Sequence, residues 1–277
     1  MATILYIHGM GGGADSRIPA FLGDWFRSHG REDLRVVVRT YDFNPDRAAA
    51  QIDAWYAGLR PALVIGESMG AVHALALLTR QSTRTGDAAC EHAAGEAGPQ
   101  GSGKFNPFGG MLPCNPASPA APFPLLLVSP ALNAPKFLYA LRGIARIPAA
   151  RKLLQRIYKP REGRRQVRDF APETLSAWGA WRPLRQSLKP GDPGPGGAFP
   201  EGSLSLPLRD QGHPAPMPAP TYAFFGRRDH YRRSGVVSLR QWRRTFGPGT
   251  YALYDGTHFM EETYLRELLI PAILERI

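Results

Sequence analysis

Short apolar segments recur along the chain and alternate with longer segments in which apolar residues are three or four positions apart. The short segments have the length of β-strands that are buried on both faces of a sheet. We expect strands at residues 3–7, 34–40, 62–65, 124–128, 222–225 and 251–254. The longer segments predict helices at residues 19–28, 45–59, 69–80, 234–245 and 261–277. This alternation predicts an α/β fold, with a mostly parallel sheet of about six strands and helices on both faces.

Three segments interrupt the alternation, and we expect them inside a single domain that spans residues 1–277. Residues 82–122 and 190–220 are rich in Gly, Pro, Ala and Ser and hold few large apolar side chains, so we expect flexible surface loops there. Residues 132–185 combine apolar and basic residues at helical spacing. That pattern predicts a helical insertion that caps the sheet.

Positive charge exceeds negative charge, with 34 Lys and Arg against 23 Asp and Glu and a formal net charge of +11. Much of the excess lies in residues 142–168, where Glu162 is the single acid. Two interpretations remain open: a solvated basic surface, or a surface that steers an anionic substrate. No sequence motif of a nucleic-acid-binding module occurs, so we do not expect a nucleic-acid partner.

The sequence favours a cytoplasmic protein. No apolar segment approaches the roughly 20 residues of a membrane-spanning helix, so we expect no membrane span. Residues 2–7 lack the basic leader and the cleavage pattern of a secretion signal. The two cysteines, Cys90 and Cys114, agree with a reducing compartment.

The strongest chemical signal is the sequence Gly-Glu-Ser-Met-Gly at residues 66–70, which fits Gly-x-Ser-x-Gly between an expected strand and an expected helix. A serine on such a tight turn exposes its hydroxyl, and the flanking glycines relieve crowding. The positive end of the following helix points to where negative charge develops during acyl transfer. Ser68 is therefore the candidate nucleophile. A glycine-rich turn with an incidental serine is the alternative.

A serine hydroxyl becomes a good nucleophile when a base takes its proton and a carboxylate orients that base. Asp229 and His258 each follow one of the last two expected strands, so both should lie at the same sheet edge as Ser68. The order Ser, Asp, His along the chain is the one used by enzymes with this kind of turn. We expect Asp229 as the acid and His258 as the base. Asp255 and His230 are neighbouring competitors.

A third element should stabilise the oxyanion with two backbone N–H groups. One belongs to Met69, directly after the nucleophile, and the other to Met10, in the glycine-rich segment at residues 8–13. Glycines there let the backbone approach a substrate closely. A phosphate-binding loop is the alternative, but the spacing differs from the known nucleotide-binding motif and no lysine follows.

Together, these motifs resemble the α/β-hydrolase superfamily. The segments that carry the resemblance are residues 6–10, 66–70, 225–229 and 255–259. Within the superfamily, the chain resembles small bacterial YqiA-like esterases, which also have a Ser/Asn-Pro-Ala segment, here at residues 129–131. The resemblance implies the α/β-hydrolase fold and hydrolysis of an ester or thioester through an acyl-enzyme, without a metal or organic cofactor.

Two hypotheses of function follow. The first is a serine hydrolase, of the carboxylesterase or thioesterase kind, that acts on a small acyl substrate that could be anionic. The second is a non-catalytic protein of the same fold that binds an anionic partner through the basic cap. The complete set of Ser68, Asp229 and His258 favours the first, because a binding protein needs neither the base nor the acid.

Overall fold

The computed structural model describes residues 1–95, 123–154, 165–181 and 221–277. Six strands form the sheet: β1 (Ala2–Ile7), β2 (Leu34–Val38), β3 (Leu63–Glu67), β4 (Leu125–Val128), β5 (Thr221–Gly226) and β6 (Tyr251–Tyr254). Their order is β2-β1-β3-β4-β5-β6, and every neighbouring pair is parallel. The predicted α/β class and the parallel sheet are confirmed.

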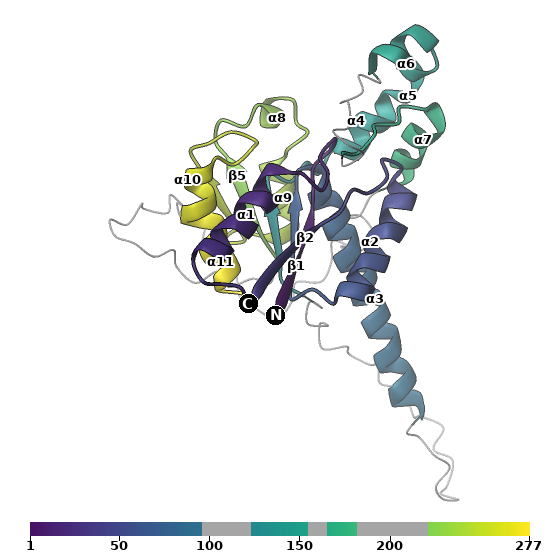
Figure 1. Cartoon of the computed structure of the whole chain (residues 1–277). Helices are drawn as coiled ribbons and strands as arrows, with labels where there is room; N and C mark the ends of the chain where they lie inside the picture. The colour runs from purple at the N-terminus through teal and green to yellow at the C-terminus, as the bar shows by residue number, and fades with distance from the viewer. Residues whose placement is uncertain (96–122, 155–164, 182–220) are drawn as a thin grey trace, which may run out of the picture.

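Helices cover both faces of this sheet and the region beyond the C-terminal ends of its strands. They are α1 (Arg17–Ser28), α2 (Pro45–Leu59), α3 (Met69–Gly95), α4 (Ala134–Ala140), α5 (Arg142–Ala145), α6 (Pro148–Leu154), α7 (Pro172–Ala180), α8 (His230–Arg233), α9 (Leu239–Phe246), α10 (Glu262–Tyr264), the π-helical segment η1 (Leu265–Leu269) and α11 (Ile270–Leu274). Helix α1 and the C-terminal helices lie on one face, and α2 and α3 lie on the other (Figure 1). Alternate residues of each strand enter the two cores, so Ile4 and Leu5 of β1 pack on opposite faces.

Residues 82–95, predicted as the start of a long loop, are helical instead, since α3 continues to Gly95. No proline interrupts residues 81–95, and their several alanines favour a helix. The rest of that predicted loop, residues 96–122, and all of residues 190–220 lie outside the described residues.

The helix predicted over residues 234–245 begins later than expected, because α8 ends at Arg233 and α9 covers Leu239–Phe246. Gly235 adopts a left-handed backbone with φ 76°, which ends the helical path after α8. Helix α9 then begins anew, and its N-terminus is capped by the Ser238 hydroxyl, which accepts a hydrogen bond from the Gln241 N–H at 3.2 Å.

The C-terminal helix predicted over residues 261–277 is present from Glu262 to Leu274 as three consecutive segments, α10, the π-helical η1 and α11. Pro271 has no N–H to donate to the carbonyl one turn earlier, and the backbone takes the wider π-helical path just before it.

The segment between β4 and β5 holds helices α4 to α7, which lie beyond the C-terminal ends of the strands (Figure 1). Trp178 of α7 is fully buried, and its ring is 6.1 Å from that of Phe43. This contact anchors the segment to the main core. Residues 155–164 and 182–185 of the predicted cap lie outside the described residues. Within the four described ranges, no helix combines the length and the apolar composition that crossing a membrane requires.

Candidate active site

Ser68 occupies the sharp turn between β3 and α3. Its φ is 52°, in the left-handed region that non-glycine residues rarely adopt. The turn is held by backbone hydrogen bonds: the Ser68 N–H donates to the carbonyl of Val128 at 2.8 Å, and the Ser68 carbonyl accepts from Ala131 at 3.0 Å. The segment at residues 129–131, singled out in the sequence by its Ser-Pro-Ala pattern, therefore braces this turn.

The glycines on each side of Ser68 are required by close packing. A Cβ atom on Gly70 would lie 2.1 Å from the carbonyl oxygen of Ile7, and one on Gly66 would lie 2.7 Å from Cα of Ala71. Both separations are far below ordinary contact. The helix after Ser68 thus packs so tightly against β1 and β3 that only glycine fits.

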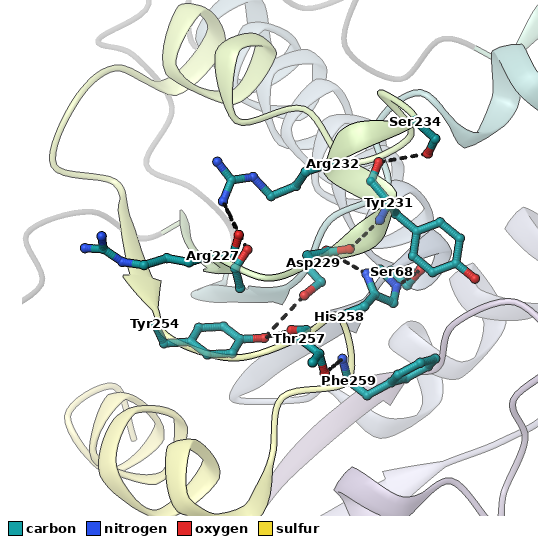
Figure 2. Close-up of polar contacts among 12 residues, drawn as sticks. Ser68, Arg227, Asp229, Tyr231, Arg232, Ser234, Tyr254, Thr257, His258 and Phe259 are labelled. Carbon is teal, nitrogen blue, oxygen red and sulfur yellow. Dashed lines mark hydrogen bonds and ion pairs between the residues drawn. The ribbon is translucent and has the colours of Figure 1, made fainter.

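The side chains of Ser68, His258 and Asp229 form a hydrogen-bonded row (Figure 2). His258 Nε2 lies 2.9 Å from Ser68 Oγ, and His258 Nδ1 lies 2.8 Å from Asp229 Oδ2. Both His258 and Asp229 are buried, at 3% exposure each. With the Nδ1 proton donated to the carboxylate, Nε2 presents its lone pair to the serine hydroxyl.

Two loops carry the histidine and the acid, and they are packed against each other. Gly226, at the end of β5, is so close to the second loop that a Cβ would lie 2.3 Å from the carbonyl oxygen of Thr257. The N–H of Arg227 donates to the Tyr254 carbonyl at 2.8 Å. The second carboxylate oxygen of Asp229 accepts from the Tyr231 N–H at 2.8 Å and caps α8. These contacts fix the direction of the carboxylate toward His258.

The competing residues considered from the sequence lie elsewhere. The Asp255 side chain is 72% exposed and pairs with Arg228, whose Nε lies 3.4 Å from a carboxylate oxygen. The His230 ring centroid is 6.3 Å from that of His258. The hydrogen bonds of the His258 ring to side chains are those with Ser68 and Asp229.

Ser68 and His258 open onto a cavity of about 460 Å³. Met10 and Met69, the residues whose N–H groups are expected to bind an oxyanion, line the same cavity. Met69 begins α3, so its N–H lies at the positive end of a long helix. The structure therefore brings all five of the predicted site residues to one place.

Gln166 is a buried residue that the sequence did not single out, and it holds the glycine-rich loop that contains Met10. Its Oε1 accepts from the Gly11 N–H at 3.0 Å, and its Nε2 donates to the carbonyls of Tyr41 and Asp42 at 3.2 and 3.3 Å. Its backbone N–H donates to the Gly12 carbonyl at 2.7 Å. No local pattern marks this glutamine, because its partners are far away in the sequence.

Two buried histidines, His8 and His73, are not among the described residues that line the cavity. Burial lowers the pKa of His8 to about 4 and that of His73 to about 3, so both rings are neutral at pH 7. The His8 ring stacks on Tyr41 with centroids 4.3 Å apart, and its Nδ1 lies 2.8 Å from the Gly9 carbonyl oxygen. His8 thus shapes the glycine-rich loop, as a structural residue would.

The rest of the cavity lining has two kinds of surface. One is apolar and comes mainly from the segment between β4 and β5, with Phe137, Leu138 and Leu141 among its residues. The other carries arginine side chains from two distant parts of the chain, with Arg17 and Arg168 among them. Over the described part of the chain, no group of His, Cys, Asp and Glu side chains has an arrangement that could hold a metal ion.

Comparisons with known proteins were made with both the sequence and the fold. No protein-family model matches the chain, and no curated protein matches it. Among solved structures, the chain is similar to a carboxylesterase of the thaumarchaeon Nitrososphaera gargenis, with 9% identity and a TM-score of 0.47 over 99% of this chain and 90% of that one. It is also similar to a monoacylglycerol lipase of Paleococcus ferrophilus, with 11% identity and a TM-score of 0.45 over 99% and 91% of the two chains. Tomato methylketone synthase I has 12% identity and a TM-score of 0.43 over 100% and 99%.

The chain's own topology defines its class. A parallel sheet in the order found here, a sharp turn with a serine after β3, and an acid and a histidine after β5 and β6 are the features of the α/β-hydrolase fold. The predicted fold is therefore confirmed. The likeness to YqiA-like esterases stays a prediction from the sequence.

Proposed function

We propose that the protein is a serine hydrolase that cleaves an ester or a thioester of a small substrate through an acyl-enzyme. The observation that carries the proposal is the row of hydrogen bonds from Ser68 through His258 to Asp229, at 2.9 and 2.8 Å, at the wall of an open cavity. A structural role alone would not require a serine in a strained backbone to face a buried histidine and a buried carboxylate.

In the first half of the reaction, His258 Nε2 takes the proton of the Ser68 hydroxyl while Oγ attacks the acyl carbonyl carbon. Asp229 keeps the Nδ1 proton in place and stabilises the imidazolium. The N–H groups of Met10 and Met69 bind the oxyanion of the tetrahedral intermediate. The C–O or C–S bond then breaks, and the imidazolium gives its proton to the departing alcohol or thiol.

In the second half, water takes the place of the departed group. His258 accepts a proton from the water as it attacks the ester on Ser68, and the acid leaves when the proton returns to Oγ. Every proton and bond is accounted for by these side chains and water, so the proposed reaction uses no cofactor. A cytoplasmic location is part of the proposal and rests on the sequence alone.

Hydrolysis of p-nitrophenyl acetate and butyrate tests this proposal. We expect the unaltered chain to turn over at least one of them and the Ser68→Ala variant to lose about a thousandfold or more in kcat. Ser28→Ala is the matched control, because Ser28 is exposed at the end of α1 and its hydroxyl bonds to neighbouring groups there, the Trp25 carbonyl at 2.9 Å and His29 Nδ1 at 3.0 Å.

Equal turnover by the Ser68→Ala variant would overturn the proposal. If no ester is cleaved and the protein instead binds an anionic macromolecule in a salt-sensitive manner, the non-catalytic alternative takes its place.

A further inference from the structure

The cavity at Ser68 is lined by three arginines, Arg17, Arg165 and Arg168. Glu67 is the one acidic side chain among the lining residues that the structure describes, and its Oε2 accepts a hydrogen bond from the Tyr6 hydroxyl at 2.7 Å. The lining therefore carries an excess of positive charge next to an apolar wall. Asp15, which pairs with Arg165, offsets part of that charge from outside the lining.

Arg17 is held beside the catalytic histidine without losing its charge. One of its terminal nitrogens donates hydrogen bonds to the carbonyl oxygens of Phe259 and Met260, directly after His258. Carbonyl groups are neutral, so they orient the guanidinium but leave its formal charge in place. The side chain lies on an exposed part of α1 at the cavity wall.

Arg165 and Arg168 come from the segment that also clamps the glycine-rich loop. Arg165 pairs with Asp15, at 3.1 Å from Nε to Oδ2, and its side chain remains 35% exposed. Its backbone forms an antiparallel bridge with Gly13. Arg168 lies three residues further on, partly buried at the same wall. The clamp therefore places both arginines at the cavity wall that also includes Met10.

Resting on the proposed function, we propose that the substrate of Ser68 carries an anionic group, a carboxylate or a phosphate, that these arginines bind. The planar guanidinium presents paired N–H donors that match both groups. The apolar wall, with Phe137, Leu138 and Leu141, receives a hydrocarbon part of the same molecule. The substrate class is thus an acyl ester or thioester that is amphipathic.

Matched substrate pairs test this proposal. The first pair is butyryl-phosphopantetheine and butyryl-pantetheine, two thioesters that differ by one phosphate. The second is p-acetoxybenzoate and its methyl ester, which differ by one carboxylate charge. Each ratio of kcat/KM is divided by the ratio of the rates with hydroxide, which removes intrinsic reactivity. We expect the anionic member of at least one pair to be favoured about tenfold, the effect of one hydrogen bond to a charged group. The pair that shows the preference identifies the anion.

Substitutions then connect the preference to the cavity. In Arg168→Gln, the normalised ratio should fall by about tenfold, and Arg168→Lys should retain more of it than glutamine does. The control is Arg35→Gln, which removes the same charge from an exposed position of β2 outside the cavity lining. An unchanged ratio in the Arg168→Gln variant contradicts the proposal.

A measurement on the unaltered chain keeps the proposal testable if a variant fails to fold. Inorganic phosphate should compete with butyryl-pantetheine more strongly than chloride does at equal ionic strength. Equal inhibition by the two salts contradicts the proposal. Turnover of the neutral members through Ser68, with normalised ratios near one, overturns the anionic substrate while the serine hydrolase stands. Absence of turnover on all four compounds, with no reaction at Ser68, overturns both.

Discussion

Gln166 should control the oxyanion site from outside the reacting groups, and the substitution Gln166→Ala tests this role. The side chain is buried, at 2% exposure, and accepts the N–H of Gly11 while donating to the carbonyls of Tyr41 and Asp42. Removal of the amide breaks these three bonds. It leaves the Gly11 N–H, in the loop that carries Met10, buried without this acceptor.

The magnitude follows from burial. A hydrogen bond contributes about 0.5–1.5 kcal/mol net, and a buried donor left without a partner costs about 1–3 kcal/mol. We therefore expect Gln166→Ala to lower the free energy of unfolding by about 2–4 kcal/mol. If the loop relaxes and the Met10 N–H leaves its position, kcat should fall by about a hundredfold or more, the effect of losing one oxyanion donor. KM should change little, because this donor acts mainly in the transition state.

Steady-state kinetics with p-nitrophenyl butyrate and urea unfolding give the two quantities separately. The matched control is Gln51→Ala. Gln51 is also a glutamine whose Oε1 accepts a backbone N–H, from Asp42 at 2.8 Å, but it is exposed and water can replace it. A Gln166→Ala variant that is destabilised but keeps its kcat would refute the positioning role and leave Gln166 as a purely structural residue.

Three further predictions concern the turn, the buried histidines and the acid. Gly70→Ala should abolish folding or activity, because its Cβ would lie 2.1 Å from a carbonyl oxygen of β1, whereas Gly58→Ala on α2, with open space around it, should raise the melting temperature slightly. The depressed pKa of His73, about 3 in the folded state against 6.5 in the unfolded chain, means that only the unfolded chain takes up a proton as pH falls below 6.5. Stability should therefore decline from pH 6.5 towards pH 3 by up to about 1.4 kcal/mol per pH unit for this group, and in urea unfolding His73→Phe should flatten that slope. Asp229→Asn should lower kcat by about 10³–10⁴ on p-nitrophenyl esters, while Asp255→Asn, at an exposed position, should leave kcat near that of the unaltered chain.

Local patterns predicted the parts of the molecule that depend on neighbouring residues. The strand-turn-helix around Ser68 could be predicted because the serine, its flanking glycines and the apolar strand before it lie within a few residues. Asp229 and His258 could be predicted because the C-terminal ends of parallel strands meet at one edge. Each of these inferences needs only the sheet and the chain order.

Other features depend on contacts between distant segments and left no mark in the sequence. Gln166 bonds to Gly11 across 155 positions, and Arg17 bonds to Met260 across 243 positions. Helical periodicity also placed the start of α9 too early, at residue 234, because it does not register the left-handed backbone of Gly235. The cationic part of the cavity therefore becomes visible only when the fold brings these residues together.

Covalent labelling of Ser68 is the most direct test of the central claim. The protein is incubated with a fluorophosphonate, and intact mass and peptide mapping locate the adduct. The account predicts one adduct on Ser68, no adduct in Ser68→Ala, and much slower labelling in His258→Ala, because the base that activates the hydroxyl is gone. Labelling that persists at the same rate in Ser68→Ala would contradict the account.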